Sequence, residues 1–137
     1  MAFAIRRVAY YHTTVRNDPG EGHAALAGLA AEGVNLLAFT AVPFGPDRTQ
    51  LTLFPDDEAA LEDAARHAGL TFDGPHPALL VNGDDELGAL AGVHSRLAKA
   101  GVNVVASSGV GDGKGRFGYV VYVRQEDIDR AIEALTQ

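Results

Sequence analysis

Histidine, serine and carboxylate side chains could do chemistry in this sequence, yet none of them forms a known catalytic or metal-binding motif. The histidines lack the H-x-x-x-H and H-E-x-x-H spacings that present two ligands on one helix face. The five are His12, His23, His67, His76 and His94. We interpret them as surface or partly buried residues and expect no metal site. His12, on an expected strand, is a candidate for lining an interface pocket.

Nucleophilic catalysis also lacks a motif. The chain has no cysteine, and neither Ser107-Ser108 nor Thr13-Thr14 shows a nucleophile elbow or a paired base. Acidic clusters at residues 56–58 and 84–86 each precede an expected helix, where carboxylates stabilise the positive end of the dipole. We therefore expect that the protein is not an enzyme and has no cofactor; a small enzyme is the least favoured hypothesis.

A glycine-rich segment at residues 108–115 resembles a phosphate-binding loop in composition. Such a loop needs a helix directly after it, so that backbone amides point at the anion. Residues 117–123 alternate as a strand instead. The segment therefore predicts a flexible hairpin, which could close over a neighbouring site.

Charge and hydropathy exclude further classes. The chain of 137 residues has 11 Lys and Arg against 18 Asp and Glu, a net charge of −7, which argues against nucleic acid as a partner. No apolar run approaches the ~20 residues that span a bilayer, and the N-terminal residues lack the apolar block of a signal peptide. We expect a cytoplasmic protein with no membrane partner.

The chain contains an internal repeat that could position these groups. The offset that aligns Gly33-Val34-Asn35 with Gly101-Val102-Asn103 also pairs Gly20 with Gly88. One gap-free offset across a helix and two strands, at half the chain length, indicates two tandem domains. We place the boundary at Gly74-Pro75, giving domains 1–74 and 75–137.

Each copy reads as alternating strands and helices. The first copy has expected strands at 8–15, 36–44, 49–54 and 70–72, with helices starting at Asp18 (as N-cap in a capping box with Glu21) and at Asp56 or Asp57. The second has strands at 78–81, 102–108 and 117–123 and helices at 86–100 and 126–135. Its last strand is absent or is supplied by Ala2–Arg7. The fold class is α+β: two ferredoxin-like βαββαβ units, each an antiparallel sheet with helices on one face.

The run Asn17-Asp18-Pro19-Gly20, followed thirteen residues later by Gly33-Val34-Asn35, resembles the ACT-domain family. Asp85-Glu86-Leu87-Gly88 and Gly101-Val102-Asn103 repeat the spacing, so the resemblance covers nearly all of the chain as two copies. The copies depart from the family pattern: Asn17 replaces an aspartate in the first, and Leu87 replaces the proline in the second. The family senses small molecules, most often amino acids, at interfaces between domains.

The resemblance implies a ligand site built from the first strand–helix loop of one domain and the start of the second strand of the adjoining domain. The candidate ligand-binding residues are Asn17, Asp18, Gly20, Glu21, Val34, Asn35, Asp85, Gly88, Ala89, Val102 and Asn103. Helix N-terminal amides suit a ligand carboxylate, and glycine leaves room for its approach. The alternative is that Asp18 caps its own helix and the glycines only turn the chain; the first copy is slightly preferred.

The leading hypothesis is a non-catalytic regulatory protein that binds an amino acid at an inter-domain or inter-subunit interface. Because no effector domain accompanies the repeats, its output would pass to a partner such as a regulated enzyme. We also expect a homo-oligomer, most simply a homodimer. The alternative is a protein-interaction or oligomerisation module that binds no small ligand.

Overall fold

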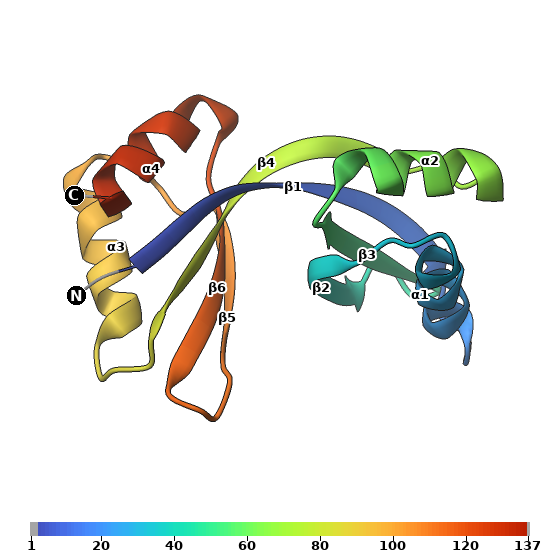
Figure 1. The fold of residues 1–137 in the computed structure, drawn as a ribbon, viewed down its shortest axis with the longest axis horizontal. Coiled ribbons are helices and arrows are strands. Elements are labelled where there is room, and N and C mark those ends of the chain that lie inside the picture. Colours follow the sequence, from blue (N-terminus) through green and yellow to red (C-terminus); the bar gives the residue numbers. More distant parts are fainter. Residues whose placement is uncertain (1–2, 137) are drawn as a thin grey trace. The chain divides into compact units, whose positions relative to one another are not determined.

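The computed structural model describes residues 3–136, whose strands and helices alternate as the repeat predicts (Figure 1). The elements are β1 (Phe3–Arg16), α1 (Glu21–Ala31), β2 (Leu36–Pro43), β3 (Arg48–Pro55), α2 (Glu58–Ala68), β4 (Asp73–Asp84), α3 (Ala89–Lys99), β5 (Ala106–Gly111), β6 (Arg116–Tyr122), the 3₁₀ turn η1 (Gln125–Asp127) and α4 (Ile128–Thr136).

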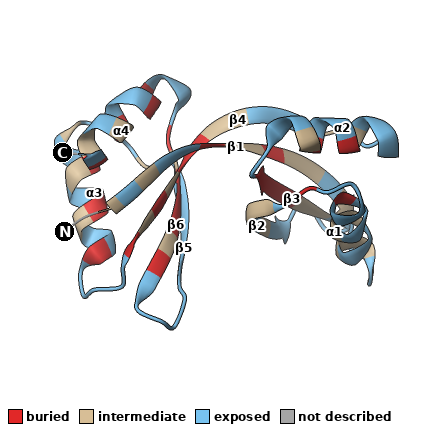
Figure 2. Ribbon diagram, in the orientation of Figure 1, coloured by how far each residue is buried: buried red, intermediate tan, exposed pale blue. Residues whose placement is uncertain are grey.

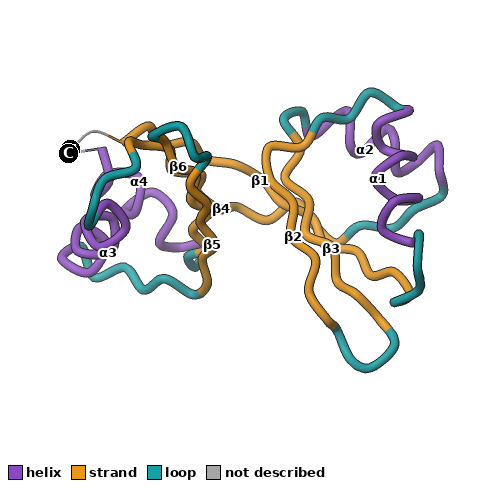
Figure 3. The backbone as a smooth tube through the Cα atoms, turned by 90° about the horizontal axis from the view of Figure 1, so that it is seen from below, coloured by secondary structure: helices purple, strands orange, loops and turns teal. Residues whose placement is uncertain are grey.

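These elements form two compact units, residues 9–76 and residues 3–8 together with 77–136. The strand order is β2-β3-β1-β4-β6-β5, so each unit has four strands, and the long strands β1 and β4 contribute one part to each. In each unit the two helices cover one face of the sheet (Figure 3). The fold is therefore the predicted tandem ferredoxin-like α+β arrangement.

The strand registers repeat at the offset that aligns Gly33 with Gly101. In one unit Tyr11 pairs with Leu53, and in the other Leu79 pairs with Val121. All six pairs of β1 with β3 recur at this offset in β4 with β6, and the β2–β3 pairs from Ala38 to Pro43 recur in β5–β6. Equivalent sequence positions therefore occupy equivalent places in the two units.

Residues 3–8 supply a fourth strand to the unit that contains residues 77–136. Phe3 and Ile5 pack against the core of this unit. The Phe3 ring lies edge-on to Phe117, with 6.4 Å between centroids, and the Arg96 guanidinium lies 5.4 Å from its centre. Residues 3–8 thus give this unit its fourth strand; Ala2, the first residue of the expected strand, lies outside the described residues. The expected boundary at Gly74-Pro75 falls inside β4.

Two element predictions are wrong at the ends of helices. Asp18 does not cap α1: the N-cap is Gly20 in the left-handed conformation, with no side-chain cap. Residues 70–72 form no strand, because the chain reaches the sheet only at Asp73. Of the two expected starts of the second helix, Asp56 and Asp57, the structure selects Asp57, whose carboxylate accepts hydrogen bonds from the amides of Ala59 and Ala60.

Burial separates the central strands from the edge strand β5. Buried residues gather on β3 and β6 and on the inner faces of the helices (Figure 2). All six residues of β5 are exposed. Among residues 3–136, no helix is long and apolar enough to cross a membrane, and no group of three or more His, Asp or Glu residues converges to hold a metal ion.

Candidate functional site

Gly20 and Gly88 occupy equivalent positions directly before α1 and α3. Their backbone φ angles are 86° and 82°, in the left-handed region that disfavours a side chain. No atom lies within 4 Å of the place where a Cβ would stand at either residue. Each glycine therefore turns the chain into its helix and leaves the helix N-terminus open.

The N-terminus of α3 offers free backbone donors. The Ala89 amide donates to the Glu86 carbonyl at 3.1 Å, and the Gly92 amide donates to the Gly88 carbonyl at 2.9 Å. Within the described residues, no hydrogen bond is formed by the amides of Leu90 and Ala91. These two N–H groups lie at the positive end of the helix dipole, where an anion is stabilised.

A pocket of about 420 Å³ lies at this end of α3. The loop that leads into the helix forms one side and contributes the carboxylates of Asp85 and Glu86; neither has an ion-pair partner among the residues described. The β5–β6 hairpin forms the other side, with Val110 and Phe117 as apolar surface. The pocket thus combines amide donors, carboxylates and apolar area within one unit.

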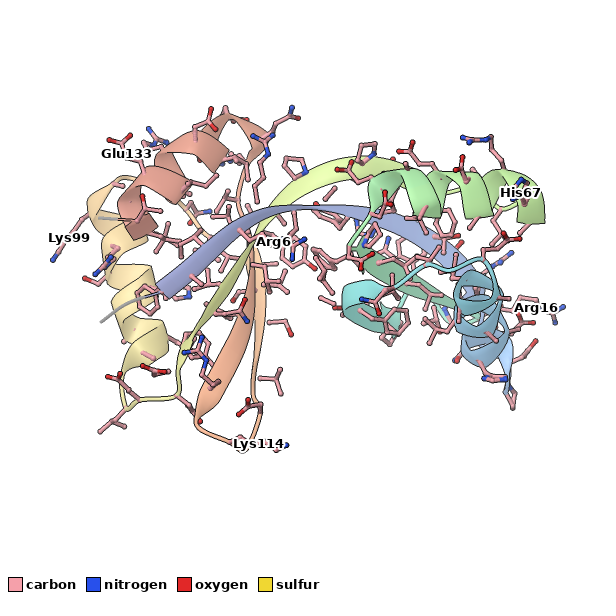
Figure 4. The ribbon with its side chains drawn as sticks, in the orientation of Figure 1. Arg6, Arg16, His67, Lys99, Lys114 and Glu133 are labelled. Carbon is pink, nitrogen blue, oxygen red and sulfur yellow. The ribbon has the colours of Figure 1, made fainter. Side chains whose placement is uncertain are left out.

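The β5–β6 hairpin holds that side of the pocket through its own turn. The Asp112 carboxylate accepts hydrogen bonds from the amides of Lys114 at 2.7 Å and Arg116 at 3.1 Å, and these bonds lower the pKa of Asp112. Lys114 lies at the tip of the hairpin (Figure 4). The Gly115 carbonyl accepts from the Asp85 amide at 2.8 Å, which ties the hairpin to the strand–helix loop. A strand follows the glycine-rich segment, so the hairpin prediction is confirmed.

The equivalent loop before α1 uses its polar side chains internally. The Asn17 side-chain oxygen accepts from the Thr49 hydroxyl at 3.5 Å, and Asp18 forms an ion pair with Arg16 at 3.2 Å. Glu21 is the first residue of α1. The two strand–helix loops both end in a left-handed glycine, but they differ in which side chains remain available to a ligand.

The remaining predicted site residues lie at the other end of the first helix of each unit. Val34 and Val102 follow α1 and α3 and are buried in the two cores. The Asn35 amide donates to Asp56 at 3.2 Å, whereas Asn103 is exposed with no side-chain partner in the described region. A helix of this length spans about 16 Å, so one unit does not bring these residues to its own strand–helix loop.

Two polar clusters lie outside the predicted residues. One is a hydrogen-bonded chain: the His94 Nε2 lies 2.6 Å from the Tyr119 hydroxyl, which donates to the Ser107 Oγ at 2.8 Å. A comparison of the two copies could have found it, because the equivalent residues of the first copy are all apolar. They are Leu26, Leu51 and Phe39.

The second cluster joins β1 and β4 in the unit of residues 9–76. The rings of His12 and His76 lie 5.9 Å apart and both approach Tyr10. His12 Nδ1 lies 3.0 Å from the Thr52 hydroxyl. Burial and the neighbouring His76 lower the pKa of His12, while Asp73 opposes that shift. Of this cluster, only His12 was predicted to line a pocket, because His76 lies on a strand far from it along the chain.

Comparisons with known proteins find similar structures but no matching sequence family. No protein-family model matches the sequence, and no curated protein matches it. A protein from Bacteroides thetaiotaomicron, named BT0572, superimposes with a TM-score of 0.81 at 19% identity over 96% of this chain and 88% of that chain.

Two further solved structures carry names that mention regulation. The regulatory subunit of aspartate kinase from Thermus thermophilus, in its ligand-free form, matches with a TM-score of 0.66 at 16% identity, covering 98% of this chain and 95% of that one. The regulatory subunit of aspartate kinase from Thermus flavus matches with a TM-score of 0.65 at 15% identity over 98% and 95%. These likenesses support the tandem ferredoxin-like α+β fold.

Proposed function

We propose that this chain is a non-catalytic regulatory protein that binds a free amino acid in the pocket beside Gly88 and acts on a partner protein. The pocket is the observation that carries the proposal, because hydrogen-bond donors for the negative end of a zwitterion and carboxylates for its positive end lie together in it. The free amides of Leu90 and Ala91 suit the ligand carboxylate. The carboxylates of Asp85 and Glu86 suit its ammonium group.

The shape of the pocket also fits an amino acid with an apolar side chain. Val110 and Phe117 provide apolar area beside the polar loop, and a volume of about 420 Å³ accommodates a small metabolite. The loop before α1 is the weaker candidate, since Asp18 is paired with Arg16 and position 17 holds a neutral asparagine. We therefore assign ligand binding to the second copy.

Regulation is the role that the structural likenesses favour. Two of the similar structures are named as regulatory subunits of aspartate kinase, and this chain covers 95% of each. Binding would act by shifting the population of a conformation or an assembly that the partner recognises. A cytoplasmic homo-oligomer that contacts a regulated enzyme remains part of this proposal.

The test is a thermal-shift screen of the purified protein against the twenty amino acids. A ligand present at 100 times its Kd adds about 2.7 kcal/mol, which raises the Tm by roughly 10 °C for a chain of this size. Gly88→Trp should remove the shift by filling the pocket. Gly20→Trp is the matched control, because it carries the same backbone strain at the equivalent position.

Asp85→Asn provides a milder test, since it installs the amide that the first copy has at Asn17. We expect weaker amino-acid binding and an unchanged Tm without ligand, because the Asp85 side chain has no ion pair among the described residues. If no amino acid shifts the wild-type Tm, or if Gly88→Trp keeps the shift, the proposed site is refuted.

A protein-interaction module is the second candidate, favoured by the exposure of β5. All six of its residues are exposed, and Val110 is 73% exposed. Unpaired strand edges readily pair with another chain. Light scattering distinguishes the two roles: a ligand-independent oligomer with no amino-acid response supports the module alone.

A further inference from the structure

A chain of hydrogen bonds runs from α3 across β6 to β5 in the unit that contains residues 77–136. His94 Nε2 lies 2.6 Å from the Tyr119 hydroxyl, and Tyr119 donates to the Ser107 Oγ at 2.8 Å. Tyr119 is only 5% exposed, whereas His94 and Ser107 reach the surface. A buried phenol therefore connects two accessible polar groups.

His94 and Ser107 open into a groove of about 490 Å³ at the end of α3 opposite to Gly88. Small apolar side chains, among them Ala98 and Val105, form much of its wall, together with the amide of Asn103. No Asp or Glu lines it, although the whole chain carries a net charge of −7. The pocket beside Gly88 differs, since two carboxylates line it.

The first copy shows that the fold does not require this polar chain. Because the strand registers repeat between the two copies, Leu26, Leu51 and Phe39 occupy the places of His94, Tyr119 and Ser107. Leu51 is buried and Leu26 packs against the core of its unit. The same architecture is thus built with apolar side chains in one copy and with three polar ones in the other.

Asn103 also differs from its counterpart in the first copy, Asn35, in the partner available to its side chain. Asn35 donates to the carboxylate of Asp56, but the residue equivalent to Asp56 is Arg124. The Asn103 amide is left without a side-chain partner in the described part of the chain, and a cation replaces an anion at the equivalent position. Arg124 does not line the groove, so the preference for the ligand rests on the Asn103 amide, which can donate to an acceptor such as a carboxylate oxygen.

The hydrogen-bond chain can present a donor to such a ligand. When the His94 Nε2–H donates to the Tyr119 oxygen, Tyr119 donates to Ser107, and the Ser107 proton is free to point into the groove. A carboxylate oxygen accepts this bond, and charged acceptors form the stronger hydrogen bonds. The bound carboxylate would then fix the direction of each hydrogen bond from His94 through Tyr119 to Ser107.

We infer that this groove is a second binding site, for a small carboxylic acid with a short apolar chain. The carboxylate accepts hydrogen bonds from Ser107 and Asn103, and the apolar chain lies against Val105. The site is separate from the amino-acid pocket beside Gly88 and does not depend on it. His94 and Tyr119 act as positioning residues that orient the Ser107 hydroxyl.

The experiment uses the uniformly ¹⁵N,¹³C-labelled full-length chain with butyrate and 2-oxobutyrate as probes. Titration should move the backbone signals of Asn103 and Ser107 and the imidazole nitrogen signals of His94. Tyr119→Phe keeps the ring and removes the hydroxyl, and we expect binding to weaken about five- to tenfold. Ser95→Ala, on an exposed residue of α3 outside the groove, should bind as wild type.

A graft of the first-copy residues, His94→Leu with Tyr119→Leu and Ser107→Phe, should fold and lose binding. The inference is overturned if neither acid moves the groove signals at millimolar concentration, or if Tyr119→Phe binds as tightly as wild type. Signals that move only at residues 85–91 also overturn it, because the acid then occupies the other pocket. An unchanged His94 imidazole in the bound state contradicts the positioning role.

Discussion

Replacing Phe3 and Ile5 by alanine tests whether the N-terminal strand segment stabilises the unit that contains residues 77–136. Both side chains are partly buried against the core formed by residues of β4, β6, α3 and α4. Complete burial would make the truncations cost about 3–5 kcal/mol for Phe and about 2–5 kcal/mol for Ile. Since each is only half-buried, we expect a combined loss of about 2.5–5 kcal/mol in the free energy of unfolding.

We expect this loss of stability to be confined to the unit that contains residues 77–136, so the assay must measure the two units separately. Hydrogen exchange followed by mass spectrometry reports protection separately for peptides from residues 77–136 and from residues 17–68. We expect protection to fall in the first set and to stay near wild type in the second. Arg6→Ala is the control, since Arg6 lies exposed on the same strand (Figure 4).

Two results would refute the reasoning. A double variant with wild-type stability would mean that Phe3 and Ile5 contribute nothing to that core. Protection lost mainly in residues 17–68 would assign the N-terminal segment to the other unit. Urea unfolding followed by tyrosine fluorescence supplies the free energy, because the chain contains no tryptophan.

The helix caps and the histidine pair give two further predictions. Asp57→Ala should lower the free energy of unfolding by about 1 kcal/mol, because it removes the side-chain cap of α2. Asp18→Ala should cost much less, because the Asp18 side chain does not cap α1. Urea unfolding midpoints compare the two variants, and equal losses would contradict the assignment of the cap to Asp57 alone. The lowered pKa of His12 means that the folded state binds fewer protons than the unfolded one, so stability should fall as pH drops below about 6.5. His12→Leu introduces the residue found at the equivalent position 80, and it should flatten the dependence of the unfolding free energy on pH between pH 8 and 5. A dependence as steep as that of the wild type would show that His12 is not its source.

The sequence alone determined the repeat and the fold class. The repeat was visible in Gly20 and Gly88 and in the two Gly-Val-Asn runs, because glycines with left-handed φ and strand-forming runs are local requirements. The start of α2 could be predicted to within one residue, Asp56 or Asp57, for the same reason, since the Asp57 cap depends on the nearby amides of Ala59 and Ala60. Local spacing failed at Asp18, where a left-handed glycine took over the start of the helix.

The tertiary structure alone decided which segments meet. Ala2–Arg7 was one option for the missing strand; its described part, from Phe3 onward, packs against the unit of residues 77–136 through Phe3 and Phe117, which are more than 100 residues apart along the chain. The two strand–helix loops lie at equivalent positions of the repeat, yet the side chains of Asn17 and Asp18 have partners within their unit, whereas those of Asp85 and Glu86 have no ion-pair partner among residues 3–136. Sequence spacing reports neighbours along the chain, whereas hydrogen-bond satisfaction and pocket formation depend on side chains that folding brings together from distant strands.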